Sequence, residues 1–221
     1  MRLEQFYPIL DSATAARLGI DPEAAAGQIL EAGARLLQFR HKGFFSREVF
    51  DQARRIAGLC RGAGAEFVIN DRADIARLLG AALHLGQDDL SPADARRVLG
   101  DGSSIGFSTH NESQFRAALS QPVNYLAFGP IFGTSSKLNP DPTVGLDELR
   151  RLRPLTTLPL VAIGGVTRAN ARSVIDAGAD SLAVIGDLFP DDGNIRSRVE
   201  EWLAICTPRP YRSEHYLPQT Q

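Results

Sequence analysis

Residues 126–137 read LAFGPIFGTSSK, and this stretch shows the pattern that decides the fold. It begins as an apolar run typical of a buried strand, turns at Gly129-Pro130, and opens into a loop with three hydroxyls and one ammonium group at residues 134–137. Hydroxyls and backbone N–H groups donate to anion oxygens, and lysine adds a compact positive charge. Ser/Thr-rich loops are also common as plain turns. The stretch alone is therefore consistent with either an ordinary loop or a phosphate-binding loop.

The same order of apolar run, polar loop and helical pattern recurs along the chain. The apolar runs are Gln5–Leu10, Leu36–Phe39, Glu66–Ile69, Ala82–Leu85, Ser104–Phe107, Tyr125–Phe128, Leu160–Ile163 and Ser181–Ile185. Their spacing of roughly 20 to 35 residues is that of a βα unit. Continuous apolar runs are typical of parallel strands buried on both faces. Eight units predict an α/β protein with a single (β/α)8 TIM barrel, the alternative being a doubly wound open sheet.

Composition narrows the class of protein. With 43% hydrophobic and 23% charged residues, the chain has an ordinary globular composition, and its net charge of −2 argues against a general nucleic-acid surface. Cys60 and Cys206 have neither disulfide-framework nor metal-site spacing, which favours a reducing compartment. Residues 1–5 contain no apolar signal region, and no run is long enough for a membrane span. We therefore expect a cytoplasmic protein without nucleic-acid or membrane partners.

No linker divides the chain, so we expect one catalytic barrel over residues 1–206. Residues 207–221 are predicted to form a C-terminal tail, because Pro208, Pro210 and Pro218 interrupt them and no periodicity survives. The sequence leaves the oligomeric state open, with a homo-oligomer among the options.

In barrel enzymes the functional residues lie at the carboxyl ends of the strands. The second run ends in Gln38-Phe39-Arg40-His41-Lys42. Side chains alternate along a strand, so Gln38, Arg40 and Lys42 are predicted to point inward together. Two cations facing a barrel mouth suit an anion such as a diphosphate. The alternative is a solvated strand end with a surface ion pair.

The next two runs end in acidic residues. Asn70-Asp71 follows the third run and Asp89 follows the fourth. Two carboxylates beside a group of cations are what a Mg²⁺–diphosphate site requires, since Mg²⁺ takes its other ligands from phosphate and water. Asp71 could instead cap the following helix. His84 is expected to pack or hydrogen-bond, because no second His or Cys stands at metal spacing.

The later runs add donors and glycines. Ser108 can donate to a phosphate or a ring nitrogen, while His110 is either a general acid or base or a structural residue. Gly164-Gly165 after the seventh run and Gly186 after the eighth predict a second phosphate site, because the backbone can approach an anion closely there. A Mg²⁺–diphosphate site beside a monophosphate site suggests transfer from an activated diphosphate to a phosphorylated acceptor.

In this order the clusters resemble the thiamine-phosphate synthase (thiamine-phosphate pyrophosphorylase) family. The matching segments are Gln38–Lys42, Ile69–Arg72, His84–Leu90, Gly106–His110, Gly129–Phe132 with Thr134–Lys137, and Ile163–Gly165. The resemblance implies a (β/α)8 barrel and a transferase. It would join hydroxymethylpyrimidine diphosphate to hydroxyethylthiazole phosphate, both small phosphorylated substrates, and release diphosphate and thiamine phosphate.

The resemblance also implies roles for individual residues. The pyrimidine diphosphate would be held by Gln38, Arg40, Lys42, Asn70, Ser108 and Lys137. Mg²⁺ would be held by Asp71 and Asp89, and the thiazole phosphate by Thr134, Ser135, Ser136, Gly165, Ile185 and Gly186. The family's chemistry is dissociative, so the catalytic residues Arg40, Lys42 and Lys137 would neutralise the departing diphosphate.

The chain departs from the family pattern at three places. Gly186 followed by Asp187 stands where the family usually has Ser, Ser136 replaces the usual Thr, and Leu10 stands where Thr more often precedes Asp11. Two alternatives stay open: a thiazole tautomerase of the same superfamily, for which His110 would be the acid–base residue, and a non-catalytic barrel that binds a phosphorylated ligand.

Overall fold

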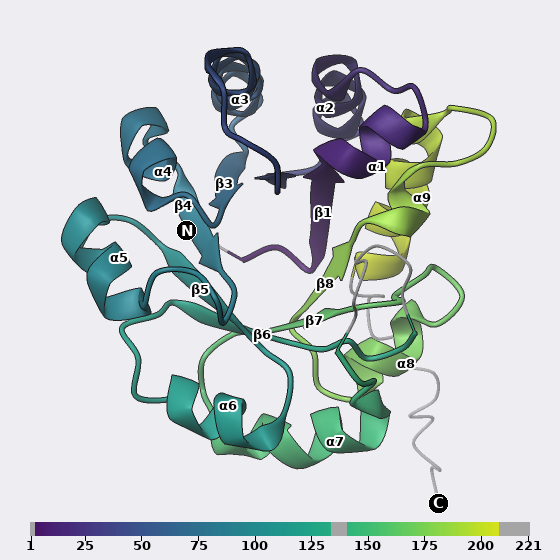
Figure 1. The fold of residues 1–221 in the computed structure, drawn as a ribbon. Helices are drawn as coiled ribbons and strands as arrows, with labels where there is room; N and C mark the ends of the chain where they lie inside the picture. Colours follow the sequence, from purple (N-terminus) through teal and green to yellow (C-terminus); the bar gives the residue numbers. More distant parts are fainter. Residues whose placement is uncertain (1–2, 134–140, 208–221) are drawn as a thin grey trace, which may run out of the picture.

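The computed structural model describes residues 3–133 and 141–207. Eight parallel strands, each hydrogen-bonded to the next, form a closed barrel (Figure 1). They are β1 (Phe6–Asp11), β2 (Leu36–Arg40), β3 (Glu66–Asn70), β4 (Ala82–Leu85), β5 (Ile105–Thr109), β6 (Tyr125–Phe128), β7 (Leu160–Ile163) and β8 (Ser181–Val184). The barrel closes where Phe6 of β1 pairs with Leu182 of β8. The predicted barrel is thus confirmed, and an open doubly wound sheet is excluded because β1 and β8 are not edges.

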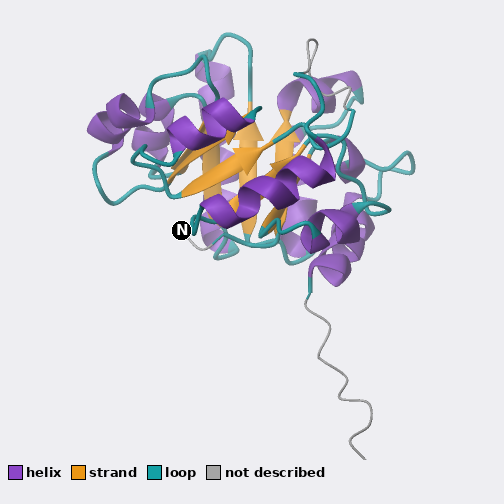
Figure 2. Ribbon diagram, turned by 90° about the horizontal axis from the view of Figure 1, so that it is seen from below, coloured by secondary structure: helices purple, strands orange, loops and turns teal. Residues whose placement is uncertain are grey.

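Helices surround the strands on the outside of the barrel (Figures 1 and 2). They are α1 (Ser12–Arg17), α2 (Pro22–Glu31), α3 (Arg47–Gly62), α4 (Ala73–Leu79), α5 (Pro92–Leu99), α6 (Glu112–Ala118), α7 (Gly145–Leu152), α8 (Ala171–Asp176) and α9 (Ile195–Cys206), with 3₁₀ turns η1 (Arg153–Leu155) and η2 (Gly186–Leu188). Asp21 and Ser91 cap α2 and α5, each followed by proline at the first helical position. No helix in these described ranges is long and apolar enough to cross a membrane.

Apolar side chains form two layers of core. The inward faces of the strands supply Tyr7, Leu36, Val68, Tyr125 and Val161, among others, to the barrel interior. The alternate residues, such as Phe6 on β1, face outward and pack against the helices. This arrangement explains why the strands read as continuous apolar runs, since both of their faces are buried.

Several strands extend beyond the apolar runs by one or two residues. β2 continues to Arg40, which pairs with Asp11 of β1, and β3 continues to Asn70, which pairs with His84 of β4. The barrel ladder therefore includes the polar residues at the strand ends, and their backbones are fixed by sheet hydrogen bonds. The predicted tail lies outside the described residues except for Thr207.

Candidate active site

A cavity of about 400 Å³ opens at the carboxyl ends of the strands, and all eight strands or the loops after them contribute to its wall. The predicted site residues in this wall are Gln38, Arg40, Lys42, Asn70, Asp71, Ser108, Gly165, Ile185 and Gly186. Thr134, Ser135, Ser136 and Lys137 lie outside the described residues, so their roles stay predictions. Most of the predicted set thus meets at one place, as parallel strands with a common carboxyl end require.

The two cations of β2 each have an acidic partner. Arg40 is held by an ion pair with Asp11 at the end of β1, and the Nζ of Lys42 lies 2.6 Å from an Asp71 carboxylate oxygen. Asp11 also accepts a hydrogen bond of 2.8 Å from the backbone N–H of Thr14 and so caps α1. Arg40 is largely buried, whereas Lys42 is half exposed and reaches toward solvent. Both cations therefore lie at the cavity wall in ion pairs, Arg40 in a buried one and Lys42 in one that is open to solvent on the lysine side.

Asp71 does not cap the helix that follows it. The N-cap of α4 is Arg72, and no side chain makes the capping hydrogen bond there. Asp71 instead has a left-handed backbone with φ of 66°, and its N–H donates to the carbonyl of His84 at 2.8 Å. This conformation costs a non-glycine residue roughly 1 to 2 kcal/mol. The local strain turns the carboxylate into the cavity wall, as a ligand-binding residue requires.

Asp89 lies beside Asp71, set back from the main cavity. Its carboxylate accepts a 2.7 Å hydrogen bond from the backbone N–H of Gly86, and the residue lines a neighbouring cavity of about 300 Å³. Burial and the contact with Asp89 raise the pKa of Asp71 to about 6, while Lys42 opposes the rise. The two carboxylates therefore meet as predicted, although Asp89 is not in the wall of the main cavity. Their mutual repulsion is what a divalent cation would relieve.

A chain of hydrogen bonds crosses the barrel interior, and four of its five members are in the cavity wall. It joins Gln38, Tyr7, Tyr125, His84 and Ser108. The His84 ring lies 5.6 Å from the Tyr125 ring and stacks on it. His84 thus packs and hydrogen-bonds, in line with the sequence prediction. Tyr7 and Tyr125 were missed because aromatic residues within apolar runs are indistinguishable from core residues, and only barrel closure brings them together.

His110 also lines the cavity, and its ring is tied to the neighbouring strand end. Its Nδ1 lies 2.6 Å from the carbonyl oxygen of Gly129 and 3.6 Å from a carboxylate oxygen of Asp141. A carbonyl oxygen only accepts, so Nδ1 carries the proton and donates. That leaves Nε2 as the nitrogen with acid–base capacity, and it assigns the ring a role in fixing the loop after β6.

Close backbone contacts shape the wall at β7 and β8. A Cβ at Gly164 would lie 2.3 Å from the Cβ of Pro130, and a Cβ at Gly165 would lie 2.4 Å from the carbonyl oxygen of Gly133. Both glycines have positive φ, of 94° and 61°. Only glycine fits at these positions. The helix α8 begins at residue 171, so these glycines lie in the loop before it.

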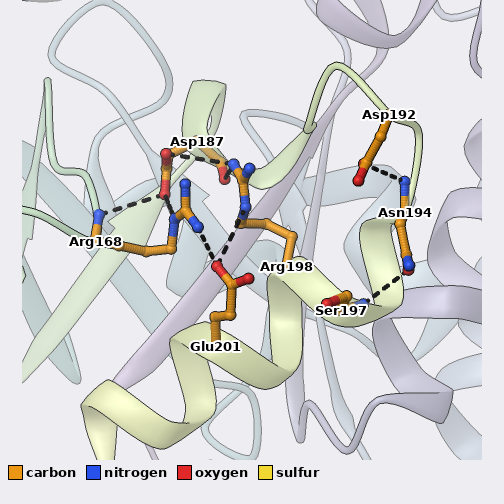
Figure 3. A network of polar contacts seen from close by, with 7 residues as sticks. All are labelled: Arg168, Asp187, Asp192, Asn194, Ser197, Arg198 and Glu201. Atoms are coloured by element: carbon orange, nitrogen blue, oxygen red, sulfur yellow. Dashed lines mark hydrogen bonds and ion pairs between the residues drawn. The ribbon is translucent and has the colours of Figure 1, made fainter.

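Asp187, which follows the Gly186 that departs from the family pattern, is part of a network of ion pairs (Figure 3). One of its carboxylate oxygens accepts from the backbone N–H and the Nε of Arg168, at 3.3 and 3.0 Å. Arg198 of α9 lies 3.4 Å from the other oxygen, and Glu201 contacts both arginines. Two cations therefore neutralise the Asp187 carboxylate, and the network joins the loop after β7 to the turn after β8.

Comparison with known proteins gives the family. The sequence model described as thiamine monophosphate synthase matches residues 6–188. A thiamine-phosphate synthase from Koribacter versatilis is 48% identical over 213 residues, covering 93% of this chain and 97% of that relative. The corresponding protein from Chloroflexus aurantiacus is 40% identical over 161 residues, covering 72% of this chain and 74% of the relative.

Solved structures agree with the sequence comparison. A thiamine phosphate pyrophosphorylase from Pyrococcus furiosus superposes with a TM-score of 0.80 at 28% identity, covering 91% of this chain and 95% of that one. A 2-keto-3-deoxy-6-phosphogluconate aldolase from Zymomonas mobilis superposes with a TM-score of 0.62 at 15% identity, covering 90% of this chain and 92% of that one. This likeness shows the fold alone. The resemblance drawn from the strand-end motifs is confirmed, and the chain belongs to the thiamine monophosphate synthase family.

Proposed function

We propose that the protein transfers the pyrimidinylmethyl group of hydroxymethylpyrimidine diphosphate to the ring nitrogen of hydroxyethylthiazole phosphate. The products are thiamine phosphate and diphosphate. One observation carries this proposal: a single cavity combines Arg40, Lys42 and Asp71 on the β2–β3 side with the glycine-lined wall after β7 and β8. A two-substrate transfer between a diphosphate and a phosphorylated acceptor needs both ends of such a cavity.

The diphosphate would be bound at the β2–β3 side. Arg40 and Lys42 are in the wall there, and each has an acidic partner that a phosphate oxygen can replace or join. The Nδ2 of Asn70 is buried and makes no hydrogen bond with the described residues, so it is free to donate to a phosphate oxygen. Lys137 would add a third cation, as the family resemblance implies. Charge stabilisation of the leaving diphosphate is the main catalytic effect these residues offer.

The metal proposal rests on Asp71 and Asp89. Their carboxylates are in contact, and burial with mutual repulsion keeps the pKa of Asp71 above its ordinary value. Two carboxylates fit Mg²⁺, which takes most of its ligands from water and substrate phosphate. When bound, Mg²⁺ would neutralise part of the diphosphate charge. Lys42, ion-paired with Asp71, would then be released to contact a phosphate oxygen directly.

The thiazole phosphate would be bound at the β7–β8 side by Gly165, Ile185 and Gly186, with Thr134, Ser135 and Ser136 from the loop after β6. Glycine at these positions lets backbone N–H groups approach an anion. Departure of diphosphate before attack would leave a pyrimidinylmethyl cation for the thiazole nitrogen to capture, and the cavity walls would align the two rings. No side-chain nucleophile is needed for this route.

A cytoplasmic location remains part of the proposal, supported by two cysteines that are both free and buried. A homo-oligomer stays among the options.

A thiochrome fluorescence assay tests the function. The protein is mixed with both precursors and Mg²⁺, with parallel samples that lack one precursor or contain EDTA. Thiamine phosphate formed only in the complete mixture supports the transferase. Consumption of a thiazole carboxylate phosphate isomer without either pyrimidine or metal would instead identify a tautomerase, and tight product binding without turnover would identify a binding protein.

A further inference from the structure

The hydrogen-bonded chain at the inner end of the cavity can be followed from Gln38 to Ser108. The Nε2 of Gln38 donates to the hydroxyl of Tyr7 at 2.8 Å, and the Tyr7 and Tyr125 hydroxyls lie 2.9 Å apart. The Tyr125 hydroxyl lies 2.9 Å from His84 Nδ1, and His84 Nε2 lies 2.9 Å from the Oγ of Ser108. This chain of hydrogen bonds thus joins residues of five strands and ends at the Ser108 hydroxyl in the cavity wall.

The donor at Gln38 favours one direction for the hydrogen bonds that follow. An amide nitrogen only donates, so the Tyr7 oxygen accepts from Gln38, and the Tyr125 oxygen offers the Tyr7 proton an acceptor 2.9 Å away. Tyr125 then donates to Nδ1 of His84, which must be unprotonated, and the ring carries its proton on Nε2. Burial raises the pKa of both tyrosines well above the ordinary value, so both phenols keep the protons that this chain requires.

The last step determines what Ser108 offers to a ligand. Its oxygen accepts from the Nε2–H of His84, so its hydroxyl proton is not used within the chain. Ser108 is part of the cavity wall. Its O–H is therefore directed to donate to an acceptor atom in the cavity rather than to accept from one. If the chain ran the other way, Ser108 would donate to His84 and present only lone pairs.

The packing around Tyr125 shows that the ring position is built into the fold. A Cβ at Gly106, on the neighbouring strand β5, would lie 1.9 Å from Cζ and 2.4 Å from the hydroxyl oxygen of Tyr125. Glycine at this position is thus required for the ring to lie across the interior. Tyr7 also meets Tyr125 edge to face, with ring centroids 6.1 Å apart. Both hydroxyls are held within hydrogen-bonding distance by this packing.

We propose that Tyr7, Tyr125 and His84 are positioning residues that hold His84 in its Nε2–H tautomer and thereby make Ser108 a hydrogen-bond donor to the substrate. The proposal rests on the proposed function for the identity of that substrate, the pyrimidine diphosphate. Tyr7 and His84 are themselves in the cavity wall, whereas Tyr125 is not among the described residues that line it. They act through Ser108, which selects a ligand that presents an acceptor atom at this place.

The tautomer can be measured without any substrate. Two-bond ¹H–¹⁵N correlation spectra of the ¹⁵N-histidine-labelled full-length protein distinguish the two neutral imidazole forms, and His84→Gln assigns the signal by removing it. The wild-type protein is expected to show His84 as Nε2–H, and Tyr125→Phe is expected to give a mixture of tautomers. A wild-type His84 that carries its proton on Nδ1 overturns the proposal.

A double-mutant cycle tests the coupling to Ser108. Tyr125→Phe is expected to lower kcat/KM for the pyrimidine diphosphate about tenfold, with KM for the thiazole phosphate unchanged. Ser108→Ala is expected to be at least as slow, and Tyr125→Phe should have no further effect in that background. Independent, multiplicative losses would show that Tyr125 only supports the fold and would overturn the proposal.

The matched control is Ser181→Ala. It deletes another buried hydroxyl, which donates to the Glu4 carbonyl at 2.6 Å at the start of β8, and its effect should be independent of Ser108. If wild-type protein makes no thiamine phosphate, the proposed function fails. The His84 tautomer still decides the direction of the hydrogen-bonded chain, so the two failures are distinguishable.

Discussion

Replacement of Asp187 by asparagine tests whether the ion-pair network stabilises the wall after β7 and β8. The wild-type carboxylate accepts from Arg168 at 3.0 Å and lies 3.4 Å from Arg198 (Figure 3). The Asp187 and Arg198 side chains are only 15% and 17% exposed, so solvent screens the pair weakly, whereas Arg168 at 33% is screened more strongly. Asparagine removes the charge and turns an N–H₂ group toward the arginines.

The structure supports an estimate of the loss. A charge-assisted hydrogen bond contributes about 1.5 to 3 kcal/mol when well buried, and the longer, partly exposed contacts here contribute less. Arg168 and Arg198 both keep Glu201 as a partner. We therefore expect Asp187→Asn to lower the free energy of unfolding by about 2 kcal/mol. For a chain of this size that corresponds to a Tm lower by about 4 to 8 °C.

Thermal unfolding followed by circular dichroism measures this loss, and steady-state kinetics measures the site. The backbone N–H of Arg168 is held by Asp187, so we expect KM for the thiazole phosphate to rise with little change in KM for the pyrimidine diphosphate. Asp192→Asn is the matched control, because Asp192 is exposed and accepts a hydrogen bond from the backbone N–H of Asn194 in its own turn (Figure 3). If both variants unfold within about 1 °C of wild type, the network does not stabilise the fold and the reasoning is refuted.

Further predictions concern the interior and the acidic pair. Gly106→Ala would place a Cβ 1.9 Å from the Tyr125 ring, and this overpacking should cost about 1 to 3 kcal/mol in chemical denaturation. Lys42→Ala and Asp71→Asn should each abolish the turnover that the thiochrome assay detects. Both variants should keep the wild-type circular dichroism spectrum, because neither residue is in the core. Retained turnover or loss of folding would contradict the site assignment. The raised pKa of Asp71, about 6, means that the metal-free fold favours its protonated form. The protonated Asp71 side chain should therefore add about 2 to 3 kcal/mol to the free energy of unfolding. This stabilisation should be complete below about pH 4 and lost as pH rises through about 6, and urea unfolding without metal would detect the trend. Because Mg²⁺ binds the ionised carboxylate, the affinity of the protein for Mg²⁺, measured by calorimetry, should fall about tenfold per pH unit below about pH 6. An affinity that does not change with pH would show that Asp71 is not a metal ligand.

The sequence was sufficient for features that depend on local periodicity. Strand alternation correctly placed Gln38, Arg40 and Lys42 on one face, and parallel strands with a common carboxyl end brought Asp71 and Gly165 to the same cavity. Both rules need only residue spacing and strand direction, which the sequence carries.

Contacts between distant strands could not be predicted in the same way. Tyr7 and Tyr125 are 118 residues apart and are joined only by barrel closure. Asp11 caps α1, and its second role as the partner of Arg40 depends on the register of β1 with β2. Gly106 offered a signal, because glycine inside a strand marks a close approach of another group. The left-handed backbone of Asp71 has no comparable signature in the sequence.

Crystallography tests whether Asp71 and Asp89 bind the metal ion. Crystals of the protein with Mn²⁺ in place of Mg²⁺ and the pyrimidine diphosphate would be measured for anomalous scattering. We expect one manganese peak bonded to carboxylate oxygens of Asp71 and Asp89 and to diphosphate oxygens. Arg40 and Lys42 should contact the same diphosphate. A diphosphate bound elsewhere, or a manganese ion that contacts neither carboxylate, would contradict it.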